Sequence, residues 1–268
     1  MLVSKKVAAA ALAAVALALT VTGVVLAVTD PNAGGNQRDP LALNGYPPRT
    51  AQLHVVISTG QAYNVTADVN VDFVHNTVGA DLQIPLLFSA TNIELRLVAR
   101  HLYVASPNLG AVIGSNWLST KVSIPSLYGL SLEMTRPDVG LISGFPQMNV
   151  THSGYLTTYR FHRDNVAIAT PSGLPFKVPA HSAIDFSITL GKQGELAATS
   201  FKVTSKHSTA WVIVTVTSYN APTHIIKPPA KDVTALNSTQ IGRIFGSTSI
   251  GNLFNPKAIT SLGQIRLS

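Results

Sequence analysis

Alternating apolar and polar residues predict a series of β-strands through the middle of the chain, from Leu53 to Tyr219. The clearest alternation covers residues 63–73, where apolar side chains alternate with asparagine, threonine and aspartate. Successive side chains of a strand point to opposite faces, so one face of this strand is expected to be buried. Further strands are predicted at residues 53–58, 80–88, 92–100, 101–105, around 116–118, and at 154–162, 184–190, 195–204 and 210–219.

Short turns connect several of these strands and favour an antiparallel meander over crossover connections. The turn Gly191-Lys192-Gln193-Gly194 is one example. The strands therefore predict a large, twisted and curved antiparallel sheet. Because such a sheet has one apolar face, a second layer is expected to cover it.

The apolar spacing changes between residues 123 and 145 and fits one or two short helices. Pro137 would stand at the break between them or in the first turn of the second. Three glycines in this stretch each cost about 1 kcal/mol relative to alanine, so these helices are expected to depend on packing against the sheet. The predicted fold class is accordingly α+β.

An uncharged apolar run at residues 7–28 follows Lys5 and Lys6 and precedes Asp30. As a helix it would span about 33 Å, enough to cross a bilayer core. The charges would place the N-terminus in the cytoplasm and the rest of the chain on the extracytoplasmic, periplasmic side. A cleaved signal peptide, with secretion of the domain, is the alternative. The expected localisation is the cytoplasmic membrane, anchored by this helix.

Four regions follow from these patterns: an anchor or signal segment at 1–28, a flexible linker at 29–50, a folded domain at 51–234 and a tail at 235–268. The tail repeats an Ile-Gly-x-(Ile/Leu)-Phe pattern at 241–245 and 250–254, which gives two short amphipathic segments. These segments would dock on the domain, or contact a membrane surface or a partner.

Composition narrows the possible functions. Apolar residues make up 46% of the 268-residue chain and charged residues 12%, which is ample for a core. The net charge of +7 is scattered without a Lys/Arg run, so no nucleic-acid partner is expected. Cysteine is absent, which excludes disulfides, thiolate metal sites, a cysteine nucleophile and lipid attachment through an N-terminal cysteine.

Known catalytic patterns are also missing. His162-Arg163-Asp164 copies a kinase tripeptide, but no glycine-rich loop or Asp-Phe-Gly accompanies it. The eight histidines show no metal-ligand spacing, and no Gly-x-Ser-x-Gly elbow occurs. We therefore predict no catalytic residue, no metal site and no cofactor. The apolar face of the sheet would enclose either a close-packed core or a cavity for a large apolar ligand.

Two groups of motifs resemble the LppX/LprA/LprF/LprG lipoproteins of mycobacteria and related actinobacteria. The first is Arg136-Pro137-Asp138-Val139-Gly140-Leu141-Ile142, followed by Gly154-Tyr155-Leu156-Thr157-Thr158-Tyr159-Arg160-Phe161. The second is Ala210-Trp211-Val212-Ile213-Val214-Thr215-Val216 with the exit Ile225-Ile226-Lys227-Pro228-Pro229. The family's acylated cysteine is missing here.

This resemblance implies a half-barrel-like sheet with helices over its concave face and a cavity that carries multi-acylated lipids across the periplasm. It marks Pro137, Asp138, Gly140 and Leu141 as the start of a lid helix. The implied function is a non-enzymatic, membrane-anchored, exported protein that shields acyl chains of envelope lipids or glycolipids during transfer. The alternative is a structural or adaptor subunit of a lipid-export or envelope complex without a ligand cavity.

The expected partners are an acylated lipid or glycolipid, the membrane through the N-terminal helix, and a lipid exporter. The residues predicted to line the cavity and its lid are Val69, Val71, Phe73, Leu82, Ile84, Leu86, Leu127, Leu130, Met134, Val139, Leu141, Ile142 and Phe145.

Overall fold

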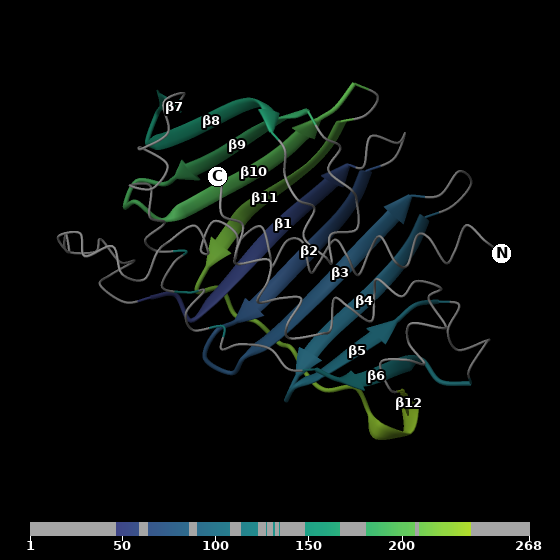
Figure 1. Ribbon diagram of the computed structural model, residues 1–268. Helices are drawn as coiled ribbons and strands as arrows, with labels where there is room; N and C mark the ends of the chain where they lie inside the picture. The colour runs from purple at the N-terminus through teal and green to yellow at the C-terminus, as the bar shows by residue number, and fades with distance from the viewer. Residues whose placement is uncertain are drawn as a thin grey trace.

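The computed structural model describes residues 47–58, 64–85, 90–107, 114–122, 127, 131, 134, 148–166, 181–206 and 209–236. These residues form one twelve-stranded sheet (Figure 1). The strands are β1 Thr50–Ser58, β2 Asn64–Asp72, β3 Thr77–Pro85, β4 Ala90–Val98, β5 His101–Ala105, β6 Trp117–Lys121, β7 Met148–Ser153, β8 Leu156–Val166, β9 Ser182–Leu190, β10 Leu196–Thr204, β11 Thr209–Tyr219 and β12 Val233–Ala235. A 3-10 turn, η2 Ala230–Asp232, precedes β12.

The sheet consists of two antiparallel meanders that lie side by side. Its strand order is β12-β6-β5-β4-β3-β2-β1-β11-β10-β9-β8-β7. The meanders β1–β6 and β7–β11 are joined where β1 pairs antiparallel with β11. Only the short β12 pairs in parallel, with β6, among the strands of the described residues. Neighbouring strands are thus mostly consecutive in sequence, as short turns allow.

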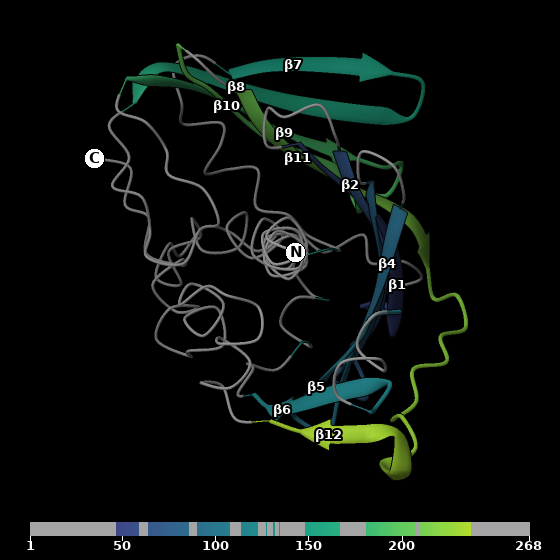
Figure 2. The ribbon, with the colours of Figure 1, turned by 90° about the vertical axis from the view of Figure 1, so that its right-hand side faces the viewer.

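The sheet is strongly curved. Seen along its edge, β5, β6 and β12 at one end and β7 and β8 at the other bend toward the same side (Figure 2). Register shifts lie within β1, β8 and β10, at Gln52/Leu53, Arg163/Val166 and Leu196/Ala198. Such irregularities bend a strand and increase its twist. The sheet therefore has a concave and a convex face.

Buried apolar side chains share the concave face. The chain between β11 and β12 passes along the convex side (Figure 2), and Ile225 in it lies against Gly79 of β3. The alternate β3 residues, Val78, Ala80 and Leu82, consequently face the concave side and are buried. Directly opposed partners carry this face across six strands in one row: Leu53, Val69, Ala80, Leu95, Val104 and Leu118.

The predicted α+β class is wrong for the part of the chain that the structure describes. That part is almost entirely β-strand, and η2 is the only helical element with bounds in it. Three single residues, Leu127, Ser131 and Met134, have helical backbone and are buried. The physical reason is that the other described segments alternate apolar and polar residues with a period of two. Their backbone groups therefore bond to neighbouring strands rather than within a helix. Residues 135–147, which include the predicted lid helix start, lie outside the described residues.

The expected localisation also needs correction. Within the described residues, no helix is long and apolar enough to cross a membrane, so the predicted N-terminal anchor has no support. Residues 7–28, on whose hydrophobic length that prediction was based, lie outside the described residues.

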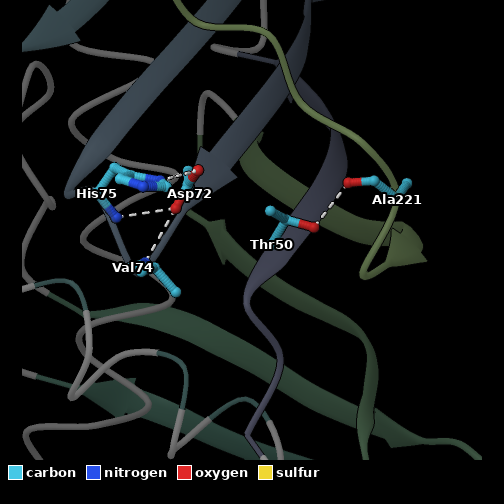
Figure 3. Close-up of polar contacts among 5 residues, drawn as sticks. All are labelled: Thr50, Asp72, Val74, His75 and Ala221. Carbon is cyan, nitrogen blue, oxygen red and sulfur yellow. Dashed lines mark hydrogen bonds and ion pairs between the residues drawn. The ribbon is translucent and has the colours of Figure 1, made fainter.

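Residues 220–229, the outer strap, connect β11 to β12 over the convex face (Figure 2). At its start the Thr50 hydroxyl donates to the carbonyl oxygen of Ala221 at 2.7 Å (Figure 3), and the Arg49 N–H donates to Asn220 Oδ1 at 2.8 Å. Further along, Arg96 Nη1 donates to the carbonyl oxygen of Ile226 at 3.0 Å. These contacts fix the strap at its start and at Ile226.

Arg96 also holds the convex face together beneath the strap. Its guanidinium carbon lies 4.6 Å from the ring centroid of Trp117, and its Nε donates to Glu94 Oε1 at 2.6 Å. By register, Arg96, Tyr103 and Trp117 share the convex face, and both aromatic side chains are buried there. A second, smaller apolar cluster therefore lies on the outside of the sheet.

The turn between β2 and β3 is organised by Asp72 (Figure 3). Its Oδ1 accepts hydrogen bonds from the backbone N–H groups of Val74 and His75, and its Oδ2 lies 2.7 Å from His75 Nδ1. Burial alone would raise the pKa of Asp72, but these bonds hold that pKa below its ordinary value. Asn76, at a positive φ of 53°, completes the turn, and its Oδ1 accepts from the N–H of Leu127 at 2.7 Å.

Candidate apolar binding surface

The apolar concave face continues from the first meander into the second. Opposed partners align across nine strands in one row: Val150, Tyr159, Ile188, Thr199, Val214, Val55, Ala67, Leu82 and Ile93. Eight of these nine residues are apolar or aromatic. Since partners in an antiparallel ladder lie on the same side, the two meanders share one apolar surface.

A second row runs beside the first and is rich in phenylalanine. It consists of Phe161, Phe186, Phe201, Val212, Ile57 and Val65. Phe161, Phe186 and Phe201, named here the aromatic row, occupy directly opposed positions on β8, β9 and β10. With strands about 4.8 Å apart, the three residues span about 10 Å along one line.

Burial of the concave face changes along the sheet. In β1 to β4 most of its described apolar side chains are buried and belong to one hydrophobic cluster, against which the partly buried Val65 packs. The aromatic row and Tyr159 are only partly buried. Tyr159, Phe161 and Phe186 nevertheless pack against the cluster. The second meander thus presents large apolar side chains that are joined to the core but partly open to solvent.

A cation shares this end of the concave face. Arg163 lies two residues beyond Phe161, opposite Ile184, and its side chain is exposed. Residues two apart on a strand face the same side. An anionic group bound beside the aromatic row would therefore lie near the positive charge of Arg163.

The structure places six of the predicted lining residues in the buried cluster. These are Val69, Val71, Phe73, Leu82, Leu127 and Met134. Leu127 and Met134, which are far from β2 and β3 in sequence, thus belong to the same cluster as those strands. Ile84 belongs to β3, but its side chain lies outside the described residues. That these residues line a lipid cavity stays a prediction.

The remaining predicted site residues lie outside the described residues. They are Leu86, Leu130, Pro137, Asp138, Val139, Gly140, Leu141, Ile142 and Phe145. The aromatic row was not among the predicted site residues. The alternation in the predicted strands at 154–162, 184–190 and 195–204 put each phenylalanine on one face, but only the register shows that the three are neighbours.

The convex face carries three carboxylates in direct opposition. Asp68, Asp81 and Glu94 are partners on β2, β3 and β4. His54 Nδ1 lies 2.8 Å from Asp68 Oδ1 at one end, and Arg96 binds Glu94 at the other. Burial and the charges of Glu94 and Asp68 raise the pKa of Asp81, partly offset by Arg96. Among the described residues, no group of three or more potential ligands is arranged to hold a metal ion.

Replacing Asp81 with asparagine is expected to stabilise the protein at neutral pH by about 0.2 to 1 kcal/mol, because like charges directly opposed on strands are destabilising. The folded-state pKa of Asp81 lies above 3.8, so the wild type gains stability as pH falls through that pKa. Thermal unfolding at several pH values checks this. The extra stability of Asp81→Asn over the wild type should vanish below pH 3.8. A stability difference that is the same at every pH would show that charge repulsion at Asp81 is not its cause.

A second polar cluster lies on the convex side of the other meander. His162 Nδ1 is 2.6 Å from Asp185 Oδ1 and His162 Nε2 is 3.1 Å from Asp164 Oδ1, while Lys202 Nζ is 3.6 Å from Asp185 Oδ2. Hydrogen bonds to Asp185 and Asp164 raise the pKa of His162. His162 and Asp164 thus belong to an exposed ion-pair cluster on the convex face, whereas Arg163 between them faces the concave side.

Comparison with known proteins adds no family. No protein-family model matches the chain, and no curated protein matches it with significance. The resemblance to the LppX/LprG lipoproteins therefore stays a prediction.

Proposed function

We propose that the protein is a non-enzymatic lipid-binding protein whose concave face shields the acyl chains of a lipid or glycolipid. The observation that carries this proposal is the aromatic row, Phe161, Phe186 and Phe201, three partly exposed phenyl groups in line with a buried apolar core. A contiguous apolar patch that stays partly open to solvent commonly marks a ligand or partner site.

The aromatic row suits an extended hydrocarbon chain better than a compact ligand. It offers a line of apolar contacts across three strands, and the core of β1 and β11 continues that line through Val212 and Ile57. Burying each methylene contributes about 0.8 kcal/mol, so affinity should rise about fourfold per added carbon while contact lasts. Arg163 at the end of the row suits a carboxylate or phosphate headgroup.

The full-length chain, titrated with a fluorescent long-chain fatty acid, tests the proposal. Phe186→Ala should weaken binding by about tenfold or more, because it removes the middle of the row and about 1.5 kcal/mol or more of apolar contact. Ile213→Ala is the matched control, since Ile213 is 38% exposed on the convex face of β11. Its affinity should equal that of the wild type.

Two outcomes would count against the proposal. An equal loss of affinity in Phe186→Ala and Ile213→Ala would show that the probe does not prefer the concave face. No binding by the wild-type chain, even after organic extraction of co-purified lipid, would instead favour the structural or adaptor role.

A further inference from the structure

The two edges of the sheet differ in how they are protected. At one edge, β12 has three residues and follows Pro228 and Pro229, and short edge strands and prolines hinder pairing with another chain. At the other edge, β7 Met148–Ser153 has six residues and contains no proline, lysine, arginine or acidic residue. Its pairing with β8 runs without a register shift. The edge at β7, outermost in Figure 1, therefore lacks these protections.

Side chains at this edge are open to solvent. Residues 149–153 are all exposed, and Val150, 39% exposed, is among the few large apolar side chains that the described residues leave so open. Val150 is also the end of the nine-strand apolar row on the concave face, opposite Tyr159. The apolar row thus ends at the open edge with nothing apolar beyond Val150 in the described residues.

The hairpin fixes which backbone groups of β7 point outward. Gly154 and Tyr155 form a two-residue loop between Ser153 and Leu156, with Gly154 at a positive φ of 59° as in a type II′ turn. Such a loop makes Ser153 and Leu156 a hydrogen-bonded pair, and pairs alternate along the ladder. The N–H and C=O groups of Val150 and His152 consequently point away from β8.

We propose that β7 pairs antiparallel with β7 of a second copy of this chain, with Val150 opposite Val150. The backbone N–H and C=O groups that point away from β8 can bond only to the equivalent groups of the second strand. This register pairs all three such residues of each strand, Met148, Val150 and His152, through about six backbone hydrogen bonds. A shift of two residues loses part of them. The two-fold axis keeps both concave faces on one side, so the apolar row continues from one copy into the next.

The lack of charged side chains on β7 allows it to pair with a second copy of itself. Within β7 only His152 can become charged, so two β7 strands meet without the like-charge repulsion that opposed acids or lysines would cause. The proposed pairing buries Val150 in each copy. Because the contact is one strand wide, association is expected to be weak and to depend on concentration.

A cysteine cross-link in the full-length chain tests the register. The natural chain has no cysteine, so a single introduced cysteine forms a disulfide only with another copy. Val150→Cys should give a cross-linked dimer, since hydrogen-bonded partners have Cα atoms about 5.5 Å apart, within disulfide range. Asn149→Cys, equally exposed, should not, because its own equivalent lies on a diagonal about 7 to 8 Å away.

Sedimentation of the cysteine-free chain over a concentration series tests association itself. The wild type should show a monomer–dimer equilibrium, and Val150→Pro should abolish it while the fold persists, because the lost N–H points outward. A wild type that stays monomeric throughout, a Val150→Pro variant that dimerises like the wild type, or equal cross-linking of the two cysteine variants would each overturn the proposal. None of these outcomes depends on lipid binding.

Discussion

Replacing Leu82 with alanine is expected to lower the free energy of unfolding by about 3 kcal/mol. Leu82 is 0% exposed and lies between Ala67 and Ile93 in the nine-strand apolar row. Removing a buried leucine side chain loses its transfer free energy and leaves a cavity, at about 2 to 5 kcal/mol in total. Urea denaturation of the full-length chain, with an unchanged dependence on urea, is the measurement.

Gln83→Ala is the matched control for Leu82→Ala. Gln83 is the next residue of β3, on the convex face, and it is exposed. Its replacement should change stability by no more than about 0.5 kcal/mol. If both variants lost the same stability, the assignment of Leu82 to the concave core would be wrong.

Replacing Arg96 with alanine is expected to cost about 2 kcal/mol of stability. The guanidinium contacts three different elements: Glu94 of its own strand, the ring of Trp117 and the strap carbonyl of Ile226. A hydrogen bond from a charged donor and a cation–π contact are each worth about 1 to 2 kcal/mol when partly buried, and these contributions are not additive. Its loss would also leave the three opposed carboxylates without their arginine.

Arg96→Lys separates charge from geometry. Lysine keeps the positive charge beside Glu94 but lacks the planar fork that reaches Ile226 while stacking on Trp117. Its stability should fall about half as far as that of Arg96→Ala. In this variant the rate of amide hydrogen exchange should increase in the strap, near Ile226, more than it does in β9. Equal stability of Arg96→Ala and the wild type would show that the strap does not need this residue.

The strands with strong alternation could be predicted from the sequence. Residues 63–73, predicted as the clearest strand, contain β2 Asn64–Asp72, because every second side chain there is apolar and buried or partly buried. By contrast, β7 was missed. Its sequence Met-Asn-Val-Thr-His-Ser has little apolar alternation, since it lies at an edge where side chains on both faces are exposed.

The α+β prediction shows where local spacing misleads. Leu127, Leu130 and Met134 have helical spacing, and helical backbone at Leu127 and Met134 agrees with it locally. Yet the class of the described fold is decided by the twelve-stranded sheet, and apolar spacing alone cannot say how much of a chain a helix will occupy. Both residues are instead shown as members of the core cluster around the sheet.

The candidate surface needed the register, which no local pattern contains. Phe161, Phe186 and Phe201 are separated by more than a dozen residues in sequence, and a shift of one residue would move any one of them to the convex face. The same holds for the strap. The sequence marks Ile225 to Pro229 only as the exit from the last strand, whereas the path of the strap over Gly79 and Arg96 depends on long-range pairing of β12 with β6.

Photocross-linking would show where on the sheet acyl chains bind, which we expect to be the concave face. A fatty acid with a diazirine near the middle of its chain would be bound to the full-length protein, irradiated, and mapped by mass spectrometry of peptides. Cross-links should concentrate in β8, β9 and β10, at and around Phe161, Phe186 and Phe201, and excess unlabelled fatty acid should remove them. Cross-links on the convex face, around Asp81 or Ile213, or spread evenly over the chain, would show that acyl chains do not bind at the concave face.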